Sequence, residues 1–251
     1  MPITAGLYYF LSEHAPPNSV PILLIHGAGG MHLSWPSQLR RLPAQTVYAL
    51  DLPGHGKSGG ISSQAINDYA ESILTWLDKL QLRQVILCGH SMGGAIAMSI
   101  ALRKPERVPA LVLIGTAARL RVNRQLLELA SRPETVHRAV DLLIEWSFDP
   151  SAPPSIVQQT RQRLYGTPVP LLYNDLLACD DFDITQQLTQ LQPRSLVITG
   201  ANDRMTPLRA GMLLAEMLPN ASFESIPDAG HMVILEYPQH VADIVLRFLK
   251  P

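Results

Sequence analysis

One short stretch of the chain, in which a buried strand turns directly into a helix through a Gly-x-Ser-x-Gly motif, constrains the fold most. Residues 85–88 are apolar and predict the strand, and residues 95–102 predict a helix with small residues on one face. Glycines at 89 and 93 are expected because side chains there would collide with the neighbouring strand and helix. Ser91 should therefore project its Oγ from the carboxyl end of a sheet, beside a helix N-terminus. The alternative is a glycine-rich turn in which Ser91 is an ordinary surface residue.

Strands alternate with helices on both sides of this motif. Apolar runs predict strands at 7–11, at the sheet edge, and at 21–25, 46–50, 110–114, 195–199 and 221–226. Helical spacing of apolar residues predicts helices at 34–42, 66–80, 207–218 and 237–249. This alternation predicts an α/β fold with a mostly parallel sheet and helices on both faces.

The alternation stops at Gly115 and resumes after Pro193. The residues between about 116 and 191 contain no convincing strand, and prolines separate helices predicted at 125–130, 134–146, 155–164 and 171–178. We therefore predict a core made of residues 1–116 and 188–251, with a helical insertion at 117–187.

Composition excludes several classes of function. The 251 residues are 47% hydrophobic and 16% charged, as expected for a globular protein, and the net charge of −1 gives no steering toward nucleic acid or an anionic membrane. Cys88 and Cys179 are isolated, and no His or Cys pair has metal-ligand spacing, so we expect neither a disulfide framework, a metal nor a cofactor. No signal-peptide pattern opens the chain and no apolar run reaches about 18 residues, so a soluble, cytoplasmic monomer or weak homodimer is expected.

A serine nucleophile needs a histidine base, which in turn needs an orienting acid. In an open α/β sheet all three should lie on loops at the carboxyl ends of strands. His231, in Asp228-Ala-Gly-His231, alone among eight histidines lies in a loop just after the last predicted strand, and we predict that it is the base rather than a solvated loop residue. His90 should point away from the site and serve packing.

Asp203 is the predicted acid. It follows the strand at 195–199 and gives the chain order Ser–Asp–His. An acid after the strand at 110–114 is an alternative placement, but Thr116 and Ala117 stand there. The competing carboxylates are less well placed along the chain; they are Asp51, Asp180, Asp181, Asp183 and Asp228.

Backbone N–H groups must stabilise the oxyanion of a tetrahedral intermediate. Met92, directly after the serine, is one predicted donor, and Ala28, in the glycine loop after the strand at 21–25, is the other, with Gly29 as the alternative. That loop lacks the Lys-Ser/Thr of a phosphate-binding loop. As substrate-binding residues we predict Gly29, Trp35 and Trp146.

Five motifs occur in an order that identifies a family. The chain resembles the α/β-hydrolase superfamily over essentially its whole length through His26-Gly-Ala-Gly-Gly30, Asp51-Leu-Pro-Gly-His-Gly-Lys-Ser58, Gly89-His-Ser-Met-Gly93, Gly200-Ala-Asn-Asp203 and Gly230-His231 through Glu236-Tyr-Pro238. It is most similar to the capped carboxylesterase branch, which includes pimeloyl-carrier-protein methyl esterases, enol-lactonases and meta-cleavage-product C–C hydrolases.

This resemblance implies that the inserted helices form a cap over the pocket. Haloalkane dehalogenases and epoxide hydrolases carry Asp where this chain has Ser91, which argues against both activities. The short amino-terminal region is a departure from the family, and it should leave the first strand rudimentary.

These observations predict a cofactor-free serine hydrolase that cleaves small carboxylic esters through an acyl-enzyme. One alternative is a lactonase or a C–C bond hydrolase with the same triad, in which Arg161 or Arg163 would hold a substrate carboxylate. An alternative of another class is a hydrolase-fold receptor for a small ligand, with slow turnover.

Overall fold

A single sheet forms the centre of the protein, whose computed structural model describes residues 2–16 and 19–250. Its strand order is β1-β2-β4-β3-β5-β6-β7-β8; β1 pairs with β2 and β2 with β4 in antiparallel orientation, and all other pairs are parallel. The bounds are β1 Ile3–Thr4, β2 Leu7–Glu13, β3 Ile22–Ile25, β4 Thr46–Leu50, β5 Ile86–His90, β6 Ala110–Ile114, β7 Arg194–Gly200 and β8 Ala221–Ile226. The predicted α/β class is thus confirmed, and the first strand has only two residues.

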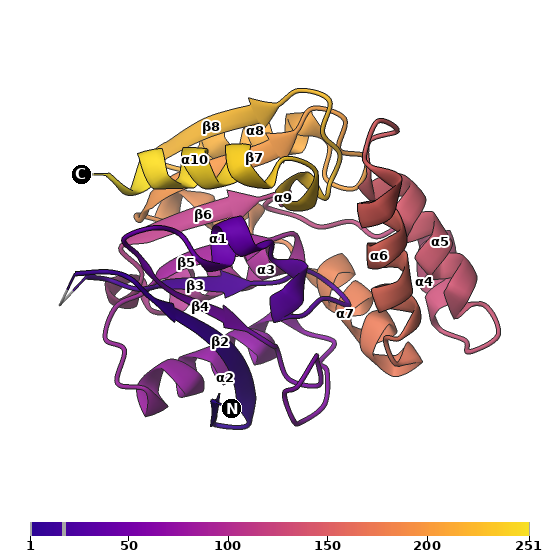
Figure 1. Cartoon of the computed structure of the whole chain (residues 1–251), viewed down its shortest axis with the longest axis horizontal. Helices are drawn as coiled ribbons and strands as arrows, with labels where there is room; N and C mark the ends of the chain where they lie inside the picture. Colours follow the sequence, from indigo (N-terminus) through magenta and orange to yellow (C-terminus); the bar gives the residue numbers. More distant parts are fainter. Residues whose placement is uncertain (1, 17–18, 251) are drawn as a thin grey trace.

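Helices cover both faces of this sheet (Figure 1). Leu23 and Ile25 of β3 pack with α2, α3 and α8, whereas Ile22 and Leu24 pack with α1 and α10, because successive side chains of a strand point to opposite faces. The helices of the core are α1 Ser37–Arg40, α2 Ile66–Lys79, α3 Met92–Arg103, α8 Leu208–Met217, α9 Val233–Glu236 and α10 Pro238–Leu249, with 3₁₀ turns at His32–Ser34 (η1), Pro105–Arg107 (η2) and Thr185–Gln190 (η3).

The helix predicted at 34–42 is shorter than expected. Trp35 has an extended backbone (φ −85°, ψ 128°), because a residue that precedes a proline is sterically disfavoured from helical angles. Helix α1 therefore begins only after Pro36 and contains four residues.

Four helices of the insertion lie together beyond the arrowheads of the parallel strands (Figure 1). They are α4 Arg124–Ala130, α5 Val136–Ser147, α6 Pro154–Tyr165 and α7 Val169–Asp181. We call residues 117–187 the cap and the rest of the chain the core. The two ends of the cap run side by side, since Leu120 N–H donates to Phe182 O (3.2 Å) and Ile184 N–H donates to Ala118 O (2.9 Å).

The carboxyl end of β3 is where the sheet opens a crevice. Strand β3 lies between β4 and β5 in the sheet. The chain continues from β3 to β4 on one edge of β3 and then crosses to β5 on its other edge. Loops at such a switch point diverge and leave room for a ligand. The loops after β3 and β5 are the two that flank this crevice.

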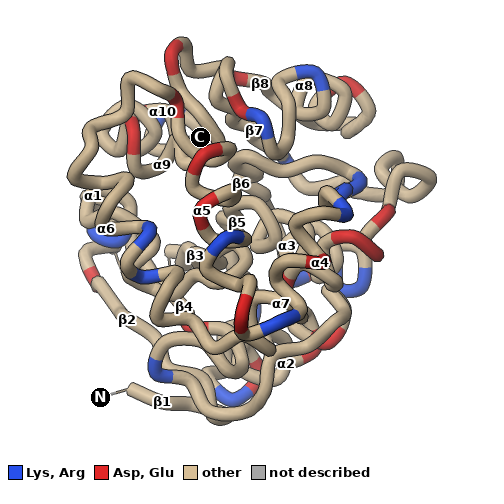
Figure 2. Tube along the Cα trace, turned by 90° about the vertical axis from the view of Figure 1, so that its right-hand side faces the viewer, with Lys and Arg blue, Asp and Glu red and all other residues tan. Residues whose placement is uncertain are grey.

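Charged residues of both signs are distributed along the chain. Figure 2 shows basic and acidic residues interspersed along the trace that faces the viewer. Within residues 2–16 and 19–250, no helix has the length and apolar character needed to cross a membrane. The cytoplasmic location, the oligomeric state and the absence of nucleic-acid or membrane partners stay predictions.

Candidate active site

Ser91 lies in a strained turn between β5 and α3. Its backbone has φ 54° and ψ −121°, a region that residues with side chains rarely adopt. A Cβ on Gly89 would overlap the Gly93 carbonyl, and a Cβ on Gly93 would overlap the Ile25 carbonyl, which bears out the predicted collisions. Such strain costs on the order of 1–3 kcal/mol and persists only where the surroundings enforce it.

Asp203 and His231 meet at the carboxyl ends of β7 and β8. The His231 Nδ1 atom lies 2.9 Å from Asp203 Oδ2, and both side chains are buried. The N–H groups of Met205 and Thr206 each donate to Asp203 Oδ1 at 2.8 Å, and the Thr206 hydroxyl donates to Oδ2 at 2.8 Å. Burial alone would raise the pKa of Asp203, but His231 and the Thr206 donors outweigh it and hold that pKa below its usual value. Asp203 is therefore an anion that can orient and stabilise His231.

His90 contributes more than packing. Its Nε2 lies 2.9 Å from the His231 carbonyl oxygen, and the two rings lie 5.0 Å apart. Burial, together with the neighbouring His231, lowers the pKa of His90 to about 3, so the ring is neutral and its Nε2–H donates to the His231 carbonyl. The expectation that His90 points away from the site is therefore wrong: it lines the same cavity as Ser91 and supports the backbone of His231.

The glycine loop after β3 forms a tight turn closed by the Gly30 N–H donating to the Gly27 carbonyl at 3.0 Å. The Gly29 N–H is already engaged, since it donates to Asp175 Oδ2 at 2.8 Å. Among the described residues, the N–H groups of Ala28 and Met92 have no protein acceptor. Of the two predicted donors in this loop, only Ala28 therefore has an N–H group that is free to bind an oxyanion, and its role stays a prediction.

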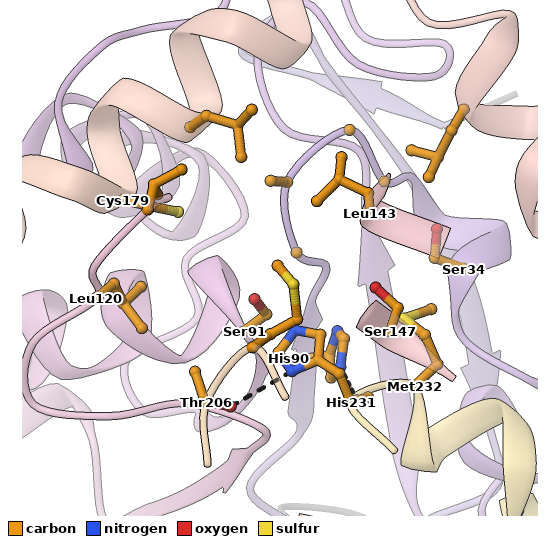
Figure 3. Close-up of a pocket in the computed structure, with 18 of the residues that line it drawn as sticks. Ser34, His90, Ser91, Leu120, Leu143, Ser147, Cys179, Thr206, His231 and Met232 are labelled. Carbon is orange, nitrogen blue, oxygen red and sulfur yellow. Dashed lines mark hydrogen bonds between the residues drawn. The ribbon is translucent and has the colours of Figure 1, made fainter. Parts of the chain in front are cut away.

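Core and cap enclose one cavity of about 300 Å³. Figure 3 shows Ser91, His90 and His231 gathered together in it, with Leu143 of the cap lying apart from them. Most cap residues that line the cavity are apolar; they include Leu120, Leu143, Ile144, Leu164, Leu176 and Cys179. Gly29 lines the cavity, and its role in substrate binding stays a prediction.

The two predicted tryptophan contacts need correction. Trp35 is fully buried in the core, where its ring lies edge-on to His90 at 6.4 Å, and it does not line the cavity. Trp146 is half-buried on α5 and lines a separate surface depression. Trp146 lies on α5 as predicted, but its side chain does not face the main cavity; Trp35 lies just before α1, with an extended backbone, and is packed in the core.

The competing acids lie elsewhere. Asp51 pairs with His32 Nδ1 at 2.8 Å, Asp183 pairs with Arg119 at 3.2 Å, and Asp228 is exposed. In the part of the chain that the structure describes, no three His, Cys, Asp or Glu side chains group in a way that could hold a metal ion.

Comparisons with known proteins place the chain in a family. The model of the α/β-hydrolase-fold family matches residues 20–238. The chain is 31% identical to 2-hydroxymuconate semialdehyde hydrolase of Pseudomonas putida, over 96% of this chain and 91% of that protein. It is also 32% identical, over 92% of its length, to the dihydrolipoyllysine-residue acetyltransferase component of an acetoin-cleaving system of Pseudomonas putida, and it spans 63% of that longer protein.

A solved structure gives the same result. A thermophilic esterase from Thermogutta terrifontis superposes with a TM-score of 0.86 at 26% identity, over 97% of this chain and 92% of that one. With the matching family model and the hydrolase relatives, this places the chain among the α/β-hydrolases, as a hydrolase of that family.

Proposed function

We propose that the protein is a serine hydrolase that cleaves small carboxylic esters through an acyl-enzyme intermediate. The observation that carries the proposal is the strained turn that presents Ser91 in the same cavity as His231, whose Nδ1 faces the Asp203 carboxylate at 2.9 Å. Ala28, whose N–H is unpaired, lines the same cavity, and Met92, whose N–H is also unpaired, directly follows Ser91 in the chain. A nucleophile, a base with its orienting acid, and oxyanion donors are the parts that acyl transfer requires.

In the acylation step, His231 Nε2 takes the proton of the Ser91 hydroxyl as Oγ attacks the ester carbonyl carbon. The carbonyl π electrons move to oxygen, and the Ala28 and Met92 N–H groups stabilise that oxyanion. The intermediate collapses when the C–O bond to the alcohol breaks and the His231 imidazolium gives its proton to the leaving oxygen. Asp203 stabilises the imidazolium throughout, since its lowered pKa keeps it ionised.

Deacylation repeats these steps with water as the nucleophile. His231 takes a proton from water, the hydroxide attacks the acyl carbon, and Ser91 leaves with the proton returned by His231. The products are one alcohol and one carboxylic acid. These acylation and deacylation steps use only the side chains and backbone groups named above.

Rapid mixing with a p-nitrophenyl ester tests the proposal. We expect a burst of nitrophenol equal to one equivalent of enzyme whenever deacylation is slower than acylation, followed by repeated turnover. A burst with negligible later turnover would favour the slow receptor instead. The absence of both would contradict the ester-hydrolase proposal.

One observation favours a second candidate, the hydrolysis of lactones or vinylogous diketones that carry a carboxylate. Arg119, Arg121 and Arg163 line the cavity, and no Asp or Glu does so among the described residues. The Arg163 Nη1 donates to Leu33 O at 3.0 Å, and burial lowers its pKa without changing its charge near neutral pH. Arg161, the other predicted candidate, instead pairs with Asp141 at 3.3 Å and does not line the cavity.

Matched substrates separate the two candidates. Hemisuccinate and butyrate esters of the same alcohol differ mainly in a terminal charge. A higher kcat/KM for the hemisuccinate that disappears in Arg163→Met would support the second candidate. A preference for butyrate in both proteins would leave the neutral ester as the substrate class.

A further inference from the structure

Asp175 is a buried anion that belongs to the cap but bonds to the core. It lies on α7 with no exposed surface. Its Oδ2 accepts from the Gly29 N–H and contacts His55 Nε2, both at 2.8 Å, and its Oδ1 accepts from the Tyr69 hydroxyl at 2.5 Å. A buried carboxylate is tolerated only when its oxygens are paired in this way. One buried charge of the cap is therefore bound to the core, with partners on both of its oxygens.

His55 is the cation of this pair. Its Nδ1 lies 2.9 Å from the Pro53 carbonyl, so both ring nitrogens face acceptors and both must carry a proton. Burial alone would lower the pKa of His55, but the Asp175 carboxylate outweighs it and raises that pKa above its usual value. The adjacent His26 ring, 4.8 Å away, stays neutral because burial, with the neighbouring His55, lowers its pKa to about 4. The charged pair is thus a single imidazolium and a single carboxylate.

The glycine loop is held from both sides of the interface. On the core side, the His26 Nδ1–H donates to the Gly27 carbonyl at 2.8 Å. On the cap side, Asp175 takes the Gly29 N–H, and Gly29 has φ +64° with Leu164 and Leu172 of the cap packed so closely that a Cβ there would lie 2.9 Å and 3.2 Å from them. Ala28, which carries the free N–H, lies between these two anchored residues.

We propose that Asp175 is a positioning residue that sets the direction of the Ala28 N–H, so that the oxyanion hole is complete only when the cap is seated on the core. The inference rests on the proposed function, since it assigns the loop a role in acyl transfer. Asp175 touches neither Ser91 nor the cavity and acts through Gly29. An oxyanion donor contributes about 10²–10³ in kcat, and this sets the upper limit on the effect of misplacing one.

The test compares a variant of the carboxylate itself with a variant of one of its hydrogen-bond partners. Asp175→Asn keeps the size of the side chain but removes the charge that fixes Gly29 and His55. Tyr69→Phe, the matched control, removes only the hydroxyl on Oδ1 and leaves the Gly29 bond intact. For both, kcat and KM are measured with p-nitrophenyl butyrate, together with the inhibition constant of phenylboronic acid, which forms a tetrahedral adduct on the nucleophile.

We expect Asp175→Asn to lower kcat by about tenfold or more, within the limit set by one oxyanion donor, with KM changed by less than about threefold. The boronic acid should bind more weakly by a similar factor, because its adduct uses the same donors as the transition state. Tyr69→Phe should lower the melting temperature but keep kcat within about threefold of the wild type. If Asp175→Asn does not fold, His55→Gln removes the counter-ion from the same oxygen and is expected to show the same kcat and inhibitor pattern.

Two outcomes would overturn the inference. One is a kcat and a boronic-acid affinity within about twofold of the wild type in a folded Asp175→Asn protein. The other is an equal loss of kcat in Tyr69→Phe, which would show that the cluster only stabilises the fold. Failure of the proposed function looks different, since the wild-type protein itself would then show neither a burst nor turnover with p-nitrophenyl butyrate and would not bind the boronic acid.

Discussion

The core and the cap both border the cavity, but they contribute different things to it. The core carries Ser91, Asp203 and His231 on loops at the carboxyl ends of β5, β7 and β8, where buried strands fix them. The cap contributes mainly apolar side chains and holds core loops by their backbone, through Asp175 on Gly29 and through the Ser147 carbonyl, which accepts from the Met232 N–H at 2.8 Å. We therefore propose that the core performs the chemistry and that the cap sets substrate size and loop position.

The largest difference between core and cap is expected when the nucleophile is removed from the core. Ser91→Ala should lower kcat by about 10³–10⁶-fold, because the members of a triad act as a unit. The unfolding transition should be unchanged or higher, since the hydroxyl has no hydrogen-bond partner among the described residues and the strained turn is kept. Steady-state assays and thermal unfolding measure both, and retention of more than about a tenth of wild-type kcat would remove Ser91 from the mechanism.

Changing the orienting acid should give the next largest effect. Asp203→Asn is expected to lower kcat on the order of 10⁴-fold at neutral pH, because an amide that donates to Nδ1 favours the wrong tautomer of His231. KM should change little, since Asp203 does not line the cavity. A kinetic comparison with Asp228→Asn, which alters an exposed acid three residues before His231, provides the control. If the Asp228 variant lost activity and the Asp203 variant did not, the acid would be misassigned.

Acid should destabilise the protein through His90 in the core. His90 has a folded-state pKa of about 3 against about 6.5 when unfolded, so the unfolded chain binds more protons between these values. The contribution of neutral His90 to the free energy of unfolding is therefore fully present above about pH 6.5. It decreases as the pH falls, by about 2 kcal/mol between pH 6.5 and pH 5. Urea titrations at these pH values should show this decrease, and it should be smaller in His90→Gln. An equal slope in the variant would show that His90 is not held neutral.

Substrate size tests the role of the cap, with the smallest effect per step. Each acyl methylene that fits the cavity should raise kcat/KM by about fourfold or less, since its burial is worth about 0.8 kcal/mol. A methylene that does not fit must displace packed side chains such as Leu143 or Leu176, at a cost of about 1–3 kcal/mol. We expect kcat/KM for the series from p-nitrophenyl acetate to palmitate to rise and then fall. A maximum at palmitate would indicate an open, lipase-like pocket.

Much of the core was predictable because its signals are local. Strand periodicity placed β3, β5 and β7 within a residue or two, and glycines 89 and 93 marked the turn at Ser91. The cap helices were predictable as helices, but the direction in which each side chain points depends on how the helices pack. This is why Trp146 was assigned to the pocket and is found elsewhere. Trp35 belongs to the core, and its extended backbone before Pro36 places its side chain in the packed interior.

Two polar residues escaped prediction, although each had a signal. Asp175 lies at helical spacing with Leu171, Leu172 and Cys179, and an acid on the buried face of a helix requires a partner. The sequence does not reveal that the partners are 106 to 146 residues away, at Tyr69, His55 and Gly29. His90 gave only its position beside Ser91, and its bond to the His231 carbonyl depends on the contact between β5 and the last loop.

The most direct test of the proposed mechanism is to identify the residue that forms the covalent bond. Wild-type protein treated with a fluorophosphonate should gain the mass of one phosphonyl group, and fragmentation should place it on Ser91 in the peptide that spans β5 and α3. The Ser91→Ala protein should gain none under the same conditions. A modified residue other than Ser91, or equal labelling of the variant, would contradict the claim that the core presents this serine for catalysis.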